Sequence, residues 1–189
     1  ARSAGEVPYV IHLSETPRPL GALGYVAAAE ELLNQSADSI GTVVVASGSG
    51  VTHAGLLVGL RACGRKDIRV IGACVRRDAI AQHARILRVS RQVEKLLGRE
   101  GLVSEQDVEV TDAVLGKGYG KVHASTREAL TMAATMEGLI LDPVYSAKTL
   151  AAAIAFARSE RPTNGVVFVH TGGLPAVFAY GDRLFEEEA

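Results

Sequence analysis

The stretch that decides the fold of this chain reads Thr42-Val43-Val44-Val45-Ala46-Ser47-Gly48-Ser49-Gly50-Val51-Thr52-His53-Ala54-Gly55-Leu56. The β-branched run at residues 43–45 predicts a buried strand, and the apolar residues from Ala54 onward predict a helix. Residues 47–52 between them form a loop of mostly small residues, whose backbone N–H groups can approach an anion. The helix start adds unpaired N–H donors and a favourable dipole. The loop is a candidate phosphate site, but a turn that serves packing alone has the same composition.

The composition indicates one nearly neutral globular domain. The chain has 189 residues, of which 48% are apolar, and a net charge of −1, so we expect a single domain over residues 1–189. This charge gives no sign of nucleic-acid binding, and no apolar run approaches the length of a membrane-spanning helix. Cys63 and Cys74 fit no metal or redox motif. We therefore expect no metal and interpret both as small core residues of a cytoplasmic protein.

Strands and helices alternate along the rest of the chain. Further strands are predicted over residues 9–13, 68–75, 108–110 and 166–169. Helices are predicted over residues 21–34, 79–97 with Asp78 as the cap, 125–136 with a capping box at 125–128, 146–158, and from about 175. This alternation indicates an α/β fold, a mostly parallel sheet with helices on both faces.

Three polar segments are predicted to lie at the carboxyl ends of strands. They are residues 47–52, 142–146 and 170–173. Because ligands of parallel sheets bind at the carboxyl ends of the strands, we expect the three segments to meet in one site.

Six motifs follow one another in a specific order along nearly the whole chain. They cover residues 8–11, 20–26, 43–59, 118–120, 137–145 and 168–180. In this order they resemble the D-cysteine desulfhydrase and 1-aminocyclopropane-1-carboxylate deaminase family, and they look closer to the desulfhydrase branch. The family consists of pyridoxal-phosphate enzymes with the tryptophan-synthase-β-like fold.

The resemblance implies that this chain is most of the large cofactor-binding domain of a longer enzyme, with the N-terminal part missing. The lysine that carries the cofactor, and the Ser-Asn-His segment beside it, would lie upstream of Ala1. No lysine of the chain matches the catalytic position; the lysines are Lys66, Lys95, Lys117, Lys121 and Lys148. Lys148 lies at a predicted helix start, and we interpret it as solvated or helix-supporting.

The resemblance also assigns a phosphate cup. It consists of Ser47, Gly48, Ser49, Gly50, Val51 and Thr52. Val51 stands where the family has glycine, so valine would strain the cup if that position requires a positive φ. His53 and His170 match positions without a proton-transfer role, and we expect them to be structural.

Four further residues match positions around the cofactor ring and the substrate. Tyr145 and Tyr119 match active-site tyrosines, which can act as general acid or base or bind the substrate carboxylate. Thr171 matches the hydroxyl that faces the pyridine nitrogen. Ser146 stands where the deaminase branch has glutamate and the desulfhydrase branch has threonine. A neutral hydroxyl there leaves the nitrogen unprotonated, which suits β-elimination.

The implied activity is β-elimination from a small amino acid such as D-cysteine, by a homodimer, giving pyruvate, ammonia and sulfide. The deaminase and a cysteate sulfo-lyase are alternatives, and Ser146 argues against the deaminase. A non-catalytic relative is a third, favoured by Val51 and by the segment 14–18, which replaces a Gly-Gly-Ser-type loop. The last alternative is an unrelated phosphate-binding α/β domain.

Overall fold

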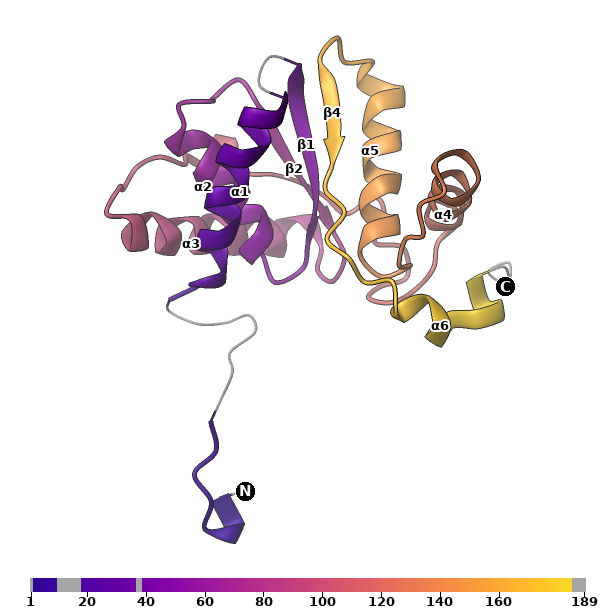
Figure 1. Cartoon of the computed structure of the whole chain (residues 1–189), viewed down its shortest axis with the longest axis horizontal. Coiled ribbons are helices and arrows are strands. Elements are labelled where there is room, and N and C mark those ends of the chain that lie inside the picture. The colour runs from indigo at the N-terminus through magenta and orange to yellow at the C-terminus, as the bar shows by residue number, and fades with distance from the viewer. Residues whose placement is uncertain (1, 10–17, 37–38, 185–189) are drawn as a thin grey trace.

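A parallel sheet lies at the centre of the structure, a computed structural model that describes residues 2–9, 18–36 and 39–184 (Figure 1). Its strands are β1 (Ile40–Ser47), β2 (Arg69–Cys74), β3 (Glu109–Thr111) and β4 (Gly165–Phe168). They stand in the order β3-β2-β1-β4, and every neighbouring pair is parallel. The predicted parallel sheet is confirmed, and β1 and β2 end side by side, since Ser47 pairs with Cys74.

Helices cover both faces of the sheet, as the sequence predicted (Figure 1). One face carries α1 (Gly21–Ser36), α2 (Val51–Ala62) and α3 (Ala79–Leu97). The other carries α5 (Ser146–Glu160), with α4 (Ala124–Glu137) packed beside it. The short helix α6 (Ala176–Tyr180) follows β4, and 3-10 turns are η1 (Arg2–Ala4), η2 (Glu105–Asp107) and η3 (Gly181–Leu184).

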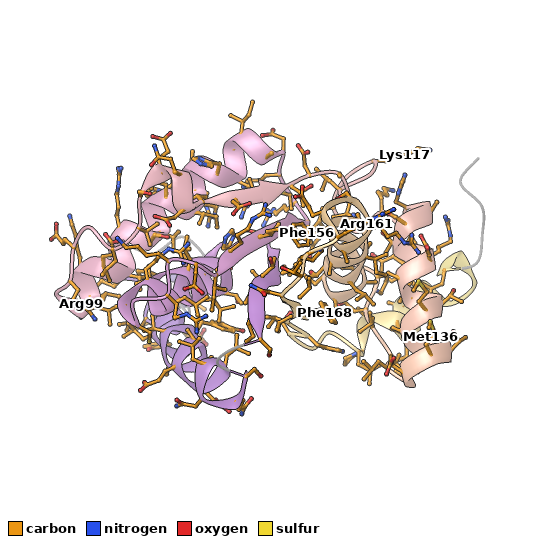
Figure 2. All side chains as sticks on the ribbon, turned by 90° about the horizontal axis from the view of Figure 1, so that it is seen from above. Arg99, Lys117, Met136, Phe156, Arg161 and Phe168 are labelled. Carbon is orange, nitrogen blue, oxygen red and sulfur yellow. The ribbon has the colours of Figure 1, made fainter. Side chains whose placement is uncertain are left out.

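The valines of β1 join two hydrophobic cores, because successive side chains of a strand point to opposite faces. Val43 and Val45 belong to the core under α1, α2 and α3, whereas Val44 belongs to the core under α5. Phe156 of α5 and Phe168 of β4 pack against this second core (Figure 2). The sheet is thus held from both faces, which fixes the positions of the strand ends and of the loops that follow them.

Several predicted boundaries differ from the structure. α2 begins at Val51 rather than Ala54, because the left-handed Gly50 (φ 88°) turns the chain directly into the helix. α4 begins at Ala124, and its N-cap is His123, whose Nδ1 accepts the N–H of Ser125. The predicted capping box at residues 125–128 therefore lies inside the helix. No strand precedes Tyr145 in the described segment 138–145, which is loop and turn.

The N-terminal strand prediction covers residues 9–13, of which only Tyr9 is described. Tyr9 is exposed and outside any strand, and most of segment 14–18 also lies outside the described residues. Cys74 is buried as expected, but Cys63 is exposed at the C-cap of α2, so the core prediction is wrong for it. Among the described residues, no helix combines the length and the apolar character needed to cross a bilayer.

Candidate active site

A cavity of about 350 Å³ opens at the carboxyl end of β1. All three polar segments contribute to its lining: Gly48, Ser49 and Thr52 from the first, Tyr145 from the second, and Thr171, Gly172 and Gly173 from the third, together with Tyr25 of α1 and Ala46 of β1. The prediction that these segments meet is confirmed. The volume lies in the range of small-molecule sites.

The loop of residues 47–52, which we call the glycine loop, connects β1 to α2. Gly50 carries its positive φ, and a Cβ there would lie 2.9 Å from Ile86 Cδ1, so this position requires glycine. Val51 is already helical, and Arg161 is the one described non-glycine residue with a positive φ. The expected strain at Val51 is therefore wrong. The N–H of Val51 donates to Ser49 Oγ at 3.4 Å, and the N–H groups that follow it in the first turn of α2 are available to an anion.

Ser47 does not line the cavity, and its side chain supports the rest of the glycine loop. Its Oγ lies 3.1 Å from His53 Nδ1 and accepts a hydrogen bond from Gln82 Nε2 at 2.9 Å. All three side chains are fully buried. Burial lowers the pKa of His53 to about 4, so its imidazole is neutral at pH 7 and serves packing, as expected. Sequence reasoning missed Gln82, since a lone glutamine in a helix is typical of a solvated face.

Tyr145 lines the cavity, and its phenol is hydrogen-bonded to Tyr119, which is not among the lining residues. The Oη atoms of Tyr119 and Tyr145 are 2.6 Å apart, and their rings meet edge to face with centroids 6.0 Å apart. Burial, followed by the hydrogen bond with Tyr119, raises the pKa of Tyr145 to about 12. The guanidinium of Arg76 lies 6.0 Å from the centre of the Tyr119 ring. Tyr145 therefore holds its proton at neutral pH and can donate it.

Asp142 fixes the position of Tyr145. Its buried carboxylate accepts the backbone N–H groups of Val144, Tyr145 and Ser146, each at 2.8 Å. It also accepts the Ser146 hydroxyl at 2.7 Å. Sequence reasoning did not assign this role, because α5 begins at Ser146 with Tyr145 as its N-cap, so Asp142 lies outside the usual capping position.

The predicted cofactor contact of Ser146 has no support in this geometry. Its side chain is fully buried, is not part of the cavity lining, and is occupied by Asp142. Ser146 instead completes the turn that leads into α5.

The third segment is placed by two left-handed glycines. Gly172 and Gly173 have φ values of 92° and 99°, and a Cβ on Gly173 would lie 2.6 Å from Asp142 Oδ1. His170 Nδ1 accepts the N–H of Gly172 at 3.0 Å, which agrees with the expected structural role. These contacts hold Thr171 at the cavity, where its hydroxyl is the predicted partner of a ring nitrogen.

The sequence matches one family model, "Pyridoxal-phosphate dependent enzyme", over residues 1–172. The chain belongs to this family. A D-cysteine desulfhydrase of Salmonella paratyphi C is 38% identical over 177 residues, covering 92% of this chain and 52% of that protein. One of Salmonella typhi is 37% identical over the same shares. The chain thus spans about half the length of the curated relatives it matches.

Solved structures confirm the predicted fold. A crystal structure of an ACC deaminase homologue matches with a TM-score of 0.85 and 35% identity, covering 97% of this chain and 55% of that one. An O-ureido-L-serine synthase matches with a TM-score of 0.57 at 16% identity, covering 91% of this chain and 52% of that one, and supports the fold alone.

The site fits the phosphate end of pyridoxal phosphate but holds no lysine for its aldehyde. The described residues that line the cavity include neither a carboxylate nor a lysine. Lys148 is fully buried, and its Nζ donates to the carbonyls of Leu115 and Gly118 at 2.7 and 3.1 Å, so the solvated alternative is wrong. It supports the loop that carries Tyr119. Lys117 is exposed at the periphery (Figure 2).

Proposed function

We propose that this chain is most of the large domain of a longer lyase, a cytoplasmic homodimer that performs β-elimination on a small amino acid. With D-cysteine and one water molecule, the products are pyruvate, ammonia and hydrogen sulfide. The observation that carries the proposal is the single cavity shared by the glycine loop, Tyr145 and Thr171. Two relatives named D-cysteine desulfhydrase, at 38% and 37% identity, support this substrate class.

The backbone binds the phosphate group of the cofactor. The N–H groups of Ser49 and Gly50 and those that follow Val51 in the first turn of α2 are the donors, and the positive end of the helix dipole favours the anion. The side chain of Thr52 lies at the same cavity. The hydroxyl of Thr171 is the neutral partner proposed for the pyridine nitrogen. When bound, the cofactor supplies the electron sink that stabilises the negative charge left at Cα.

Tyr145 is the proposed proton donor to the leaving sulfur. Its pKa of about 12 keeps the phenol protonated at pH 7, so Tyr145 has a proton to donate and is not the base. The bond between Tyr119 and Tyr145 orients the phenol, and the three N–H bonds to Asp142 fix the backbone beneath it. Removal of the Cα proton is assigned to a lysine outside this chain.

Pyruvate release from the complete polypeptide tests the proposal. The substrates are D-cysteine, L-cysteine, β-chloro-D-alanine and L-cysteate, and we expect D-cysteine to be turned over. A polypeptide that binds the cofactor and turns over none of them contradicts the lyase and supports a non-catalytic relative. In the isolated chain, a borohydride-reducible imine with pyridoxal phosphate on Lys148 would contradict the assignment of the lysine to another segment.

The deaminase is the second candidate, favoured by the match to the ACC deaminase homologue. It converts 1-aminocyclopropane-1-carboxylate and water to 2-oxobutanoate and ammonia. Formation of 2-oxobutanoate from this substrate, without pyruvate from D-cysteine, would select it.

A further inference from the structure

Three side chains on one side of the glycine loop bind its carbonyl groups. We propose that Gln82 and Arg85 of α3, together with Arg77 just before α3, are positioning residues that orient the peptide groups of the loop toward a bound phosphate. The inference rests on the proposed phosphate site and adds the residues that give the site its shape.

The contacts are short and cover two successive peptide groups. The carbonyl oxygen of Gly48 accepts from Arg77 Nη1 at 2.8 Å and from Gln82 Nε2 at 3.3 Å. The carbonyl oxygen of Ser49 accepts from Arg85 Nε at 2.6 Å. Since a carbonyl oxygen can only accept, it is the nitrogen of the Gln82 amide that faces Gly48. The same nitrogen donates to Ser47 Oγ.

The direction of the N–H groups follows from these contacts. In a planar trans peptide unit the carbonyl and the next N–H point in opposite directions. Since the Gly48 and Ser49 carbonyls point toward Arg77, Gln82 and Arg85, the N–H groups of Ser49 and Gly50 point away from them. Gly48 and Ser49 line the cavity, and the three positioning residues do not. The contacts therefore hold the two N–H groups in the orientation that an anion needs.

Burial makes these contacts costly to remove. Gln82 is 0% and Arg85 3% exposed, so a loop carbonyl that loses its partner has little access to water. A loop without them can rotate its peptide groups and present carbonyl oxygens to the phosphate, which repels them. Two of the three residues also carry positive charge, which favours an anion at the loop. Gln82 is neutral, so its removal tests positioning without a change of charge.

The test measures binding of 4′-deoxypyridoxine 5′-phosphate, which cannot form an imine, and of unphosphorylated 4′-deoxypyridoxine to this chain by calorimetry. We expect Gln82→Met to weaken the phosphorylated ligand about fivefold and Arg85→Met about tenfold or more. Neither should change the binding of the unphosphorylated ligand. Arg88→Met is the matched control, since Arg88 is an exposed arginine of the same helix, and we expect parental affinity.

A second readout needs no ligand. In ¹H–¹⁵N spectra of the free chain, the amide signals of Ser49 and Gly50 should shift in Gln82→Met and stay unchanged in Arg88→Met. If Gln82→Met or Arg85→Met does not fold, Arg77→Met replaces it in the test, because Arg77 is only half-buried. We expect Arg77→Met to weaken binding of the phosphorylated ligand and to shift the amide signals of Ser49 and Gly50.

The outcomes separate the two proposals. A parent chain that does not prefer the phosphorylated ligand overturns the phosphate site and this inference with it. A parent that prefers it, with variants that match it in affinity and in amide signals, overturns the positioning role alone. Weakening of both ligands to the same extent also overturns it, because that result reports a general loss of structure.

Discussion

The glycine loop and Tyr145 border the same cavity, but the loop and the pair of Tyr145 and Tyr119 are held in different ways. The loop is held by hydrogen bonds among the side chains of Ser47, His53 and Gln82, which are all fully buried. The phenols of Tyr119 and Tyr145 are bonded to each other, and their side chains are 52% and 38% exposed. The anion-binding part of the site is thus preorganised within this chain, whereas the proton-transfer part is more open. We therefore expect substitutions at the residues that support the loop to lower the free energy of unfolding, and substitutions of the two tyrosines to lower activity.

The largest effect is expected under the glycine loop, at Gly72 of β2. A Cβ there would lie 2.6 Å from His53 Cε1 and 2.9 Å from Ser47 Cβ, so Gly72→Ala should lower the free energy of unfolding by about 3 kcal/mol. Urea unfolding measures this. Gly24→Ala in α1 is the control, since no atom lies within 4 Å of the added Cβ, and it should be neutral or stabilising. Equal stability of both variants would show that the support is not tightly packed.

At the tyrosine pair the effect should be kinetic. In the complete enzyme we expect Tyr145→Phe to lower kcat for β-elimination by about 10²-fold, the scale of a positioned acid–base group, with folding preserved. Pyruvate release measures it. Tyr180→Phe is the control, because its phenol donates to the Gly120 carbonyl outside the cavity lining. If Tyr145→Phe keeps full activity, its assigned role is wrong, and Tyr119 becomes the candidate.

Acid should weaken the support under the loop, because His53 titrates differently in the two states. Its pKa is about 4 in the fold and has the ordinary histidine value of 6.5 in the unfolded chain, so the unfolded chain takes up the proton first as the pH falls. The contribution of His53 to the free energy of unfolding is complete above pH 6.5 and is lost as the pH falls from 6.5 to 4. At pH 5 the free energy of unfolding is lower by about 2 kcal/mol. Urea unfolding at pH 8 and pH 5 measures this loss. His53→Asn should lose less on acidification, whereas His83→Gln, at a partly exposed site, should behave as the parent.

The smallest effect is expected at Val51. Since Gly50 carries the positive φ, Val51→Gly should lower the free energy of unfolding by about 0.5 kcal/mol, through the poor helix propensity of glycine. It should not tighten cofactor binding. Gly50→Ala, by contrast, should weaken binding, because its Cβ would meet Ile86. A measured gain in affinity with Val51→Gly would reinstate the strain that the sequence predicted.

The fold was predictable because its signals are local. The valines of β1 form a continuous β-branched run, and the helix at residues 79–97 has near-regular apolar spacing, so the α/β alternation can be seen without the structure. The meeting of residues 47–52 and 170–173 then follows from the rule that parallel strands end at one edge. Tyr145 was expected at the same site, but no strand precedes it in the described segment 138–145, so the rule does not account for its position.

The inward-facing polar side chains were not predictable. Gln82 and Lys148 belong to residue types that are mostly exposed, and only tertiary packing makes them buried. The hydroxyls of Ser47 and Ser146 turn inward because their partners, His53 and Asp142, lie there. Which glycine of the loop takes the positive φ also depends on the packing of α3, since Ile86 closes the space above Gly50.

The position of β1 in the sheet has a consequence for the order of folding. One neighbour, β2, follows it closely in the chain, but the other, β4, comes from near the far end. During synthesis β1, β2 and the helices α1–α3 can assemble first, with one side of β1 still unpaired. The last step must close a long loop, which is entropically slow. Until β4 docks, the open side of β1 can pair with another nascent chain, so slow folding and chaperone dependence are expected.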